Sequence, residues 1–282
     1  MKILRTVSEM AAASLALKRD GKPVALVPTM GALHEGHAAL MRRARESGAA
    51  VIVSIYVNPT QFGPKEDFAR YPRTFEADCA VCQREGVAVV FAPTDDEMYP
   101  GGVASVSTWV EELQVARRLE GERRPGHFRG VCTVVAKLFN IVQPDTAFFG
   151  QKDYQQLKVI ERMVRDLRYP ITIVPVPTVR EADGLAMSSR NRYLSSEERQ
   201  QALSLSRALR AAADRFQRGE TDPHRLEAVM AQVVSAAPRV RLDYAEVVDG
   251  ETLDPTATVR RGDVALIAAH VGTTRLIDNV IL

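Results

Sequence analysis

The chain has 282 residues, of which 46% are hydrophobic and 26% are charged, as is typical of a globular protein with one large or two moderate domains. Its formal net charge is only +2 and both signs are interspersed, which argues against nucleic acid or an acidic membrane as the main partner. Three cysteines do not fit a secreted disulfide framework, and no apolar run approaches the about 18 residues of a membrane span, so we expect a soluble cytoplasmic protein.

Short apolar runs alternate with helical patterns through the first two thirds of the chain. They lie at residues 24–27, 50–57, 87–91, 147–149 and 171–176. Continuous apolar strands separated by helices predict an α/β fold with a parallel sheet covered on both faces. In such sheets ligands bind beyond the carboxyl ends of the strands, so we expect the functional residues in the loops that follow these runs.

The last third of the chain has a different pattern. Ser195 and Glu198 form a predicted capping box that begins a long helix through Arg210, and a second helix follows to about Ala236. Two strands are expected after it, at residues 241–248 and 264–271. We therefore predict two domains, a first one over residues 1–182 and a smaller C-terminal α+β domain over residues 183–282.

The segment P-T-M-G-A-L-H-E-G-H, residues 28–37, directly follows the first predicted strand. His34 and His37 fall at the start of the next helix with both rings on one face, beside free amides and the positive end of the helix dipole, where an anion is favoured. Gly31 and Gly36 would let phosphates approach the backbone closely. Each histidine taken alone fits a solvent-facing role equally well. A metal site is not expected, because the spacing is not that of His-Glu-x-x-His.

The common nucleotide-binding motifs are absent from this sequence. No Gly-x-Gly-x-x-Gly follows a strand, which disfavours a dinucleotide-binding fold. The glycines of residues 121–126 have P-loop spacing, but His127 and Phe128 stand where Lys and Ser or Thr are required.

Four segments together carry a resemblance to a known family. They are residues 28–37, Y-V-N-P-T-Q-F-G at 56–63, F-G-Q-K-D-Y-Q-Q at 149–156 and E-A-D-G-L-A-M-S-S-R-N-R-Y-L at 181–194. The first segment resembles the HIGH signature of the nucleotidyltransferase superfamily, and residues 187–191 resemble its KMSKS-type loop. In this order along essentially the whole chain, the four segments resemble the pantoate–β-alanine ligase family.

The resemblance implies a Rossmann-like domain with a smaller C-terminal lid, a homodimer, and ATP and Mg²⁺ as requirements. It implies an ATP-dependent condensation of (R)-pantoate with β-alanine through a pantoyl-adenylate, releasing AMP and pyrophosphate. By resemblance, the catalytic residues are His34, His37 as a proton donor, and Lys152. The residues that the resemblance places on the nucleotide are Met30, Gly31, His34, His37, Gly150, Lys152, Asp153, Val179, Met187, Ser188, Ser189 and Arg190.

Pantoate is expected to contact Gln61 and Gln156, which the resemblance assigns, together with Asn58. Neutral amides suit hydroxyls and a carboxylate, although each of these residues alone would be an ordinary polar side chain. Lys152 alone would likewise be an ordinary surface lysine at a helix start. Gln151 departs from the family, which usually carries a charged residue there.

Three further features bear on the site. Cys79 and Cys82 lack a second ligand pair for zinc and are interpreted as packing residues. Asp78 is an outside candidate for a magnesium contact, with ATP holding most of the ion's ligands. Arg124 lies in a segment that resembles the family's flexible active-site flap.

Two alternatives remain at this point. One is another adenylyltransferase of the HIGH superfamily that acts on a phosphorylated acceptor, which Gln61, Gln156 and the long C-terminal domain disfavour. The other is an RNA-binding module using the arginine pairs at 117–118 and 123–124, which lack interleaved aromatic residues and a basic face.

Overall fold

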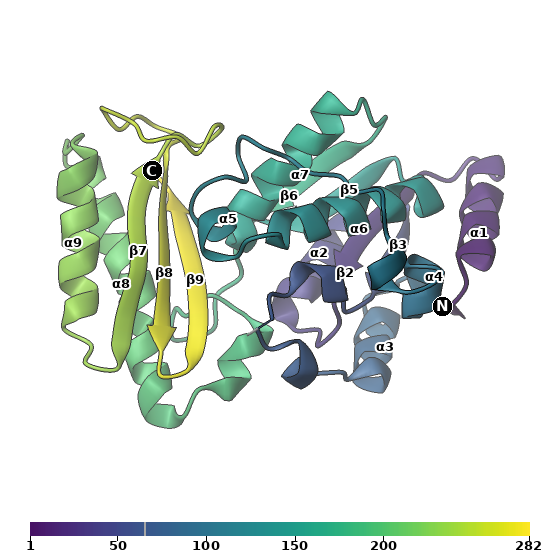
Figure 1. Cartoon of the computed structure of the whole chain (residues 1–282), viewed down its shortest axis with the longest axis horizontal. Coiled ribbons are helices and arrows are strands. Elements are labelled where there is room, and N and C mark those ends of the chain that lie inside the picture. Colours follow the sequence, from purple (N-terminus) through teal and green to yellow (C-terminus); the bar gives the residue numbers. More distant parts are fainter. Residues whose placement is uncertain (65) are drawn as a thin grey trace. The chain divides into compact units, whose positions relative to one another are not determined.

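The computed structural model describes residues 1–64 and 66–282, and Figure 1 shows their helices and strands. Contacts divide the chain into two compact units. Unit 1 comprises residues 1–151 and 159–177, and unit 2 comprises residues 152–158 and 178–282.

This division differs from the predicted boundary after residue 182, because two segments that precede it belong to unit 2. The hydroxyl of Tyr154 donates to the carbonyl of Gly250 at 2.9 Å. The guanidinium of Arg180 contacts the Asp278 carboxylate through both terminal nitrogens, at 2.7 and 3.0 Å. Such contacts between residues about a hundred positions apart cannot be read from sequence periodicity.

Unit 1 is built on a six-stranded parallel sheet with the order β1-β4-β3-β2-β5-β6. The strands are β1 (Lys2–Leu4), β2 (Val24–Thr29), β3 (Ala50–Ile55), β4 (Val89–Phe91), β5 (Thr146–Gly150) and β6 (Thr172–Val176). The five predicted strands are confirmed, with ends shifted by up to two residues. The edge strand β1 was missed, because its residues Lys2 and Ile3 are exposed and it lacks the continuous apolar run that marks the buried strands.

Helices flank this sheet, as predicted. They are α1 (Val7–Arg19), α2 (Glu35–Glu46), α3 (Phe75–Arg84), α4 (Asp95–Met98), α5 (Glu120–Arg123), α6 (His127–Val142) and α7 (Tyr154–Asp166), whose first turn belongs to unit 2. Alternate residues of β2, Ala25 and Val27, share a core with Met41 of α2 and Cys82 of α3. The helices α1 and α6 pack on each other and on β2. Alternation along β2 therefore lets helices bury both of its sides.

Unit 2 packs two helices on an antiparallel sheet of order β7-β8-β9. Its elements are α8 (Ser196–Gln217), α9 (Pro223–Ser235), β7 (Val240–Val248), β8 (Val264–Val271) and β9 (Thr274–Ile281). The predicted capping box at Ser195 and Glu198 is confirmed, with reciprocal hydrogen bonds of 2.8 and 3.2 Å. The helix continues to Gln217, beyond the predicted end, because its apolar face continues with the buried Leu209 and Ala212.

Over the part of the chain that the structure describes, none of the helices combines the length and apolar character that crossing a membrane requires.

Candidate active site

The two histidines of the first motif meet at the start of α2. His34 is the residue before the first helical turn and His37 is the third residue of that turn. The backbone N–H of His34 donates to Nδ1 of His37 at 3.2 Å, and the two ring centroids are 4.1 Å apart. A Cβ on Gly36 would lie 2.9 Å from Cε1 of His34, so a larger residue there would push the His34 ring away from the turn. The predicted placement of both rings at the helix N-terminus is confirmed.

The loop between β2 and α2 is fixed by hydrogen bonds to a buried carboxylate. Asp78 of α3 is only 2% exposed, and its oxygens accept the backbone N–H groups of Ala32 at 3.0 Å and Leu33 at 2.8 Å. Gly31 has a φ of +78°, and a Cβ there would lie 2.9 Å from Oδ2 of Asp78. The hydroxyl of Thr74 also donates to Oδ1 of Asp78, at 3.1 Å. The structure therefore uses the Asp78 carboxylate to shape this loop, a role different from the magnesium contact considered above.

Asp78 has two cysteine neighbours in α3, Cys79 and Cys82. Among residues 1–64 and 66–282, no group of three or more His, Cys, Asp or Glu side chains is placed to hold a metal ion. Cys82 is fully buried in the core under α3, and burial raises the pKa of its thiol to about 12. The pKa of Cys79 is also raised, again mainly by burial. Both cysteines therefore have the protonated, inert character of packing residues.

A second set of predicted residues gathers at the carboxyl end of β3. Gln61 ends the short 3-10 turn Pro59–Gln61; its Oε1 accepts from Nδ2 of Asn58 at 3.2 Å, and its Nε2 donates to Sδ of Met30 at 3.0 Å. Asn58 is 1% exposed, and its Oδ1 also accepts from the hydroxyl of Tyr99 at 2.7 Å. The structure thus brings Met30, Asn58 and Gln61 together. The Asn58 amide orients the Gln61 side chain through its hydrogen bond to Oε1.

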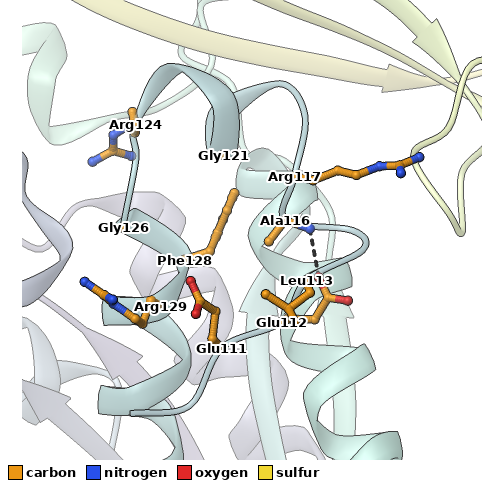
Figure 2. Close-up of a pocket in the computed structure, with 10 residues that line it drawn as sticks. All are labelled: Glu111, Glu112, Leu113, Ala116, Arg117, Gly121, Arg124, Gly126, Phe128 and Arg129. Carbon is orange, nitrogen blue, oxygen red and sulfur yellow. Dashed lines mark hydrogen bonds between the residues drawn. The ribbon is translucent and has the colours of Figure 1, made fainter. Parts of the chain in front are cut away.

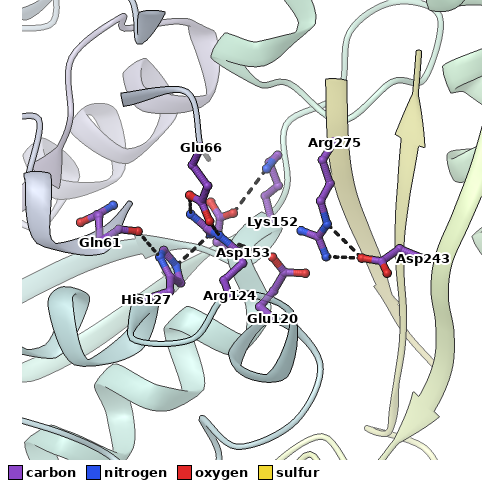
Figure 3. Close-up of polar contacts among 9 residues, drawn as sticks. All are labelled: Gln61, Glu66, Glu120, Arg124, His127, Lys152, Asp153, Asp243 and Arg275. Atoms are coloured by element: carbon purple, nitrogen blue, oxygen red, sulfur yellow. Dashed lines mark hydrogen bonds and ion pairs between the residues drawn. The ribbon is translucent and has the colours of Figure 1, made fainter. Parts of the chain in front are cut away.

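Unit 2 carries the residues predicted after β5. Lys152 and Asp153 lie in the 3-10 turn Gln151–Asp153, with Nζ of Lys152 3.4 Å from Oδ1 of Asp153 (Figure 3). The carbonyl of Lys152 accepts from Nδ2 of Asn279 at 2.8 Å, which fixes the turn against β9. Of the two consecutive glutamines that follow, Gln155 is buried and Gln156 is half-buried. Gln156 is therefore the one that keeps access to solvent, and its contact with pantoate stays a prediction.

The remaining predicted residues also lie in unit 2, on one loop. The backbone N–H of Met187 donates to the carbonyl of Val179 at 3.0 Å, so these two positions are adjacent. Ser188 caps the 3-10 helix Ser189–Tyr193, its Oγ accepting the N–H of Arg190 at 3.3 Å. The structure thus joins Val179 to residues 187–190. Closure of this loop over ATP stays a prediction.

A small cavity lies in unit 1 between α6 and the segment before it (Figure 2). Its volume is about 150 Å³, well below the several hundred Å³ of a nucleotide-sized pocket. The lining residues are Glu111, Glu112, Leu113, Ala116, Arg117, Gly121, Arg124, Gly126, Phe128 and Arg129. Arg124, the predicted flap residue, is the one lining residue singled out above for a role in the site.

One residue close to Gln61 was missed by sequence reasoning. His127, the first residue of α6, was noted only as a mismatch to the P-loop motif. Its Nδ1 lies 2.8 Å from the backbone carbonyl of Gln61, and its Nε2 lies 3.0 Å from Nη1 of Arg124. The 66 positions between His127 and Gln61 leave no local pattern that would have revealed this contact.

Comparisons with known proteins identify the family of the chain. The sequence profile described as pantoate-beta-alanine ligase matches residues 2–281. This chain belongs to the pantoate–β-alanine ligase family. Pantothenate synthetase from Thermotoga petrophila is 52% identical over the full length of both chains, and that from Acidobacterium capsulatum is 55% identical over 100% of this chain and 97% of its own.

Solved structures of the family share the fold. Pantothenate synthetase from Thermus thermophilus has a TM-score of 0.93 at 46% identity, covering 100% of this chain and 99% of its own. Pantoate-beta-alanine ligase from Francisella tularensis, solved with β,γ-ATP and β-alanine, has a TM-score of 0.80 at 31% identity, covering 100% and 97%. The chain is accordingly a ligase with a six-stranded parallel sheet and a second, three-stranded sheet, and an adenylyltransferase of another family is not favoured.

Proposed function

We propose that this ligase condenses (R)-pantoate with β-alanine at the expense of ATP, giving pantothenate, AMP and pyrophosphate. Membership of the pantoate–β-alanine ligase family supports this proposal, and the ATP and β-alanine bound to the Francisella tularensis relative support the same substrates. The single observation that carries it from the geometry is the paired His34 and His37 at the N-terminus of α2, beside a loop shaped by Asp78.

The first step is adenylation of pantoate. A carboxylate oxygen of pantoate attacks the α-phosphorus of ATP, and the bond from that phosphorus to the bridging oxygen breaks, releasing pyrophosphate. Charge grows on the phosphate oxygens, so cationic and N–H groups near them accelerate this step. Because Nδ1 of His37 accepts a hydrogen bond, the neutral ring carries its proton on Nε2 and donates from there. We assign phosphate binding to His34, His37 and Lys152, with the Nε2–H of His37 as a hydrogen-bond donor to the phosphate oxygens.

The second step forms the amide. The unprotonated amine of β-alanine attacks the acyl carbon of pantoyl-adenylate, AMP leaves with the electrons of the broken carbon–oxygen bond, and the new amide nitrogen loses a proton. Holding two reactants in one site supplies much of the rate enhancement for such a step. A two-step route also accounts for the need to keep water away from the adenylate.

The remaining residues are assigned to substrate binding. Gln61 and Gln156 bind pantoate through neutral amides that match hydroxyls and a carboxylate, with Asn58 acting on pantoate through Gln61. The other residues that we assign to the nucleotide are Met30, Gly31, Gly150, Asp153, Val179, Met187, Ser188, Ser189 and Arg190.

Magnesium enters with ATP as part of the substrate. Mg²⁺ usually combines phosphate oxygens and waters with one or two carboxylates, so it does not need a protein cluster of its own. We also propose that the ligase acts in the cytoplasm as a homodimer. Biosynthetic relatives and the unpaired thiols Cys79, Cys82 and Cys132 support that compartment.

Product analysis tests the proposal most directly. The purified protein is incubated with MgATP, pantoate and β-alanine, and the products are separated by chromatography with mass detection. Pantothenate, AMP and pyrophosphate in equal amounts are expected, and ADP with phosphate would contradict the assignment. Pantoate-dependent exchange of labelled pyrophosphate into ATP without β-alanine tests the first step alone. Exchange that requires the amine would exclude the two-step route.

A further inference from the structure

The backbone of the Gln61 turn is attached to the start of α6. The carbonyl of Gln61 accepts a hydrogen bond from Nδ1 of His127 at 2.8 Å (Figure 3). A Cβ on Gly130, one turn further along α6, would lie 2.3 Å from the carbonyl oxygen of Thr60. The turn and the helix thus touch backbone to backbone, and the imidazole of His127 holds the carbonyl of Gln61 to the start of the helix.

The other ring nitrogen of His127 is fixed by an ion pair. Nη1 of Arg124 donates to Nε2 of His127 at 3.0 Å, while Nε and Nη2 of Arg124 donate to the two carboxylate oxygens of Glu66 at 2.8 and 2.7 Å. A guanidinium nitrogen is always a donor, so Nε2 of His127 accepts and the ring proton lies on Nδ1. The Arg124–Glu66 ion pair therefore selects the His127 tautomer in which Nδ1–H donates to the Gln61 carbonyl.

The Gln61 side chain is oriented by a different residue. Nδ2 of Asn58 donates both to Oε1 of Gln61 and to the carbonyl of Gly130, each at 3.2 Å. With its backbone held by His127 and its Oε1 held by Asn58, the Gln61 amide has one orientation, with its nitrogen away from Asn58. A preoriented amide loses little conformational freedom when it binds substrate.

We propose that His127 is a positioning residue for pantoate: held in one tautomer by the Arg124–Glu66 pair, it fixes the backbone of Gln61 and so the amide that contacts pantoate. This inference rests on the proposed function, since it concerns the pantoate site. His127 acts through Gln61 and makes no contact with the reacting atoms.

The protonation state of His127 agrees with this role. Burial, assisted by the Arg124 guanidinium, lowers the pKa of His127 to about 4, against the smaller opposing effects of the Gln61 carbonyl, Glu66 and Glu120. The ring is therefore neutral at neutral pH, as a residue that accepts at Nε2 and donates at Nδ1 must be.

Two substitutions separate the two ring nitrogens. The amide nitrogen of asparagine takes the place of Nδ1 and keeps the donor to Gln61, whereas the amide of glutamine reaches only the place of Nε2 and keeps the contact to Arg124. Loss of one such hydrogen bond weakens binding by roughly three- to tenfold. His127→Gln should therefore raise KM for pantoate by that factor with KM for ATP unchanged, and His127→Asn should stay close to wild type in both.

The measurement is steady-state pantothenate formation with pantoate and ATP varied separately, alongside the melting temperature of each variant. Equal pantoate defects in both variants, or an ATP defect as large as the pantoate defect, would overturn the positioning role. Should His127→Gln fail to fold, Glu66→Gln serves in its place, since it loosens Arg124 and leaves the ring intact. Glu66→Gln should raise KM for pantoate by a smaller factor than the one expected for His127→Gln. An unchanged KM for pantoate would equally overturn the proposal. A wild-type protein that makes no pantothenate would instead refute the proposed function, so the two failures are distinguishable.

Discussion

The backbone N–H of His34 donates to Nδ1 of His37, so the first turn of α2 fixes both the orientation and the tautomer of the His37 ring. A histidine in this position acts as the side-chain partner of a capping box, a role more often filled by Glu or Gln. The same ring thus serves the helix through one nitrogen and leaves its Nε2 proton for chemistry. These two roles can be separated by substitution.

His37→Asn should keep the helix but lose the hydrogen-bond donor at Nε2. The side-chain oxygen of asparagine lies where Nδ1 does and can accept the His34 N–H, but nothing replaces Nε2. The rate of adenylate formation should fall by about 10²- to 10³-fold, as expected when one hydrogen-bond donor to the charge growing on phosphate is lost, while the melting temperature stays near that of wild type. Single-turnover assays and thermal denaturation measure the two effects.

His37→Ala is the matched control for that substitution. It removes both ring nitrogens, so the rate loss should be of similar size. The lost cap should also lower the free energy of unfolding by about 1 kcal/mol, and with it the melting temperature. A rate for His37→Asn close to wild type would remove His37 from the catalytic residues.

Lys152→Ala should slow adenylate formation by orders of magnitude, because an ammonium group that stabilises charge on phosphate oxygens has no substitute in alanine. Stopped-flow or quench measurements of pantoyl-adenylate in a single turnover report this step directly. Cys79→Ala, half-exposed and outside the proposed site, serves as the control and should turn over normally. Near-normal adenylation by Lys152→Ala would show that the turn after β5 binds ATP without assisting the reaction.

Local patterns predicted five of the six strands of unit 1, the capping box of α8 and the histidine pair, because each depends on residues within one turn or one strand. The roles of Asp78 and His127 could not be predicted in this way. Asp78 accepts from Leu33 across 45 positions, and His127 contacts Gln61 across 66. Such contacts depend on how α3 and α6 lie on the sheet, which a single sequence does not encode locally.

Asp78→Asn tests the loop that follows β2. Its carboxylate accepts two backbone N–H groups and a hydroxyl, and an amide has only one acceptor oxygen for the same three donors. Loss of a hydrogen bond to a charged acceptor costs about 1.5–3 kcal/mol, so the variant should unfold at lower denaturant concentration and bind ATP more weakly. Urea titration measures the stability, and calorimetry measures the affinity for ATP. A wild-type ATP affinity would show that the loop conformation does not depend on Asp78.

Gln61→Ala and Gln156→Ala should each weaken the use of pantoate at least several-fold while leaving ATP affinity nearly unchanged. A lost hydrogen bond typically costs ~0.5–1.5 kcal/mol, and more where a buried partner is left unsatisfied. Pantoate dependence of adenylate formation and, separately, calorimetric ATP binding distinguish the two substrates. Gln151→Ala, a glutamine near Gln156 without an assigned role, is the control. An ATP defect as large as the pantoate defect would mean that the pantoate pocket lies elsewhere.

The stability of the protein should depend on pH through His127. Its folded pKa of about 4 lies below the ordinary value of 6.5, so between these values the unfolded chain binds a proton that the folded chain does not. The free energy of unfolding is therefore highest above about pH 6.5 and falls as the pH is lowered toward 4. The contribution of this residue amounts to about 2 kcal/mol between pH 7 and pH 5.

Other groups titrate in the same range, so the difference between wild type and His127→Gln isolates this effect. Urea denaturation at pH 7 and pH 5 should show wild type losing about 2 kcal/mol more than the variant, because glutamine has no proton to bind. The glutamine variant is expected to be the less stable of the two at pH 7, where the neutral ring is fully accommodated, and the gap should narrow at pH 5. Parallel losses in both proteins would mean that the folded and unfolded chains bind this proton alike, so that burial does not lower the pKa of His127.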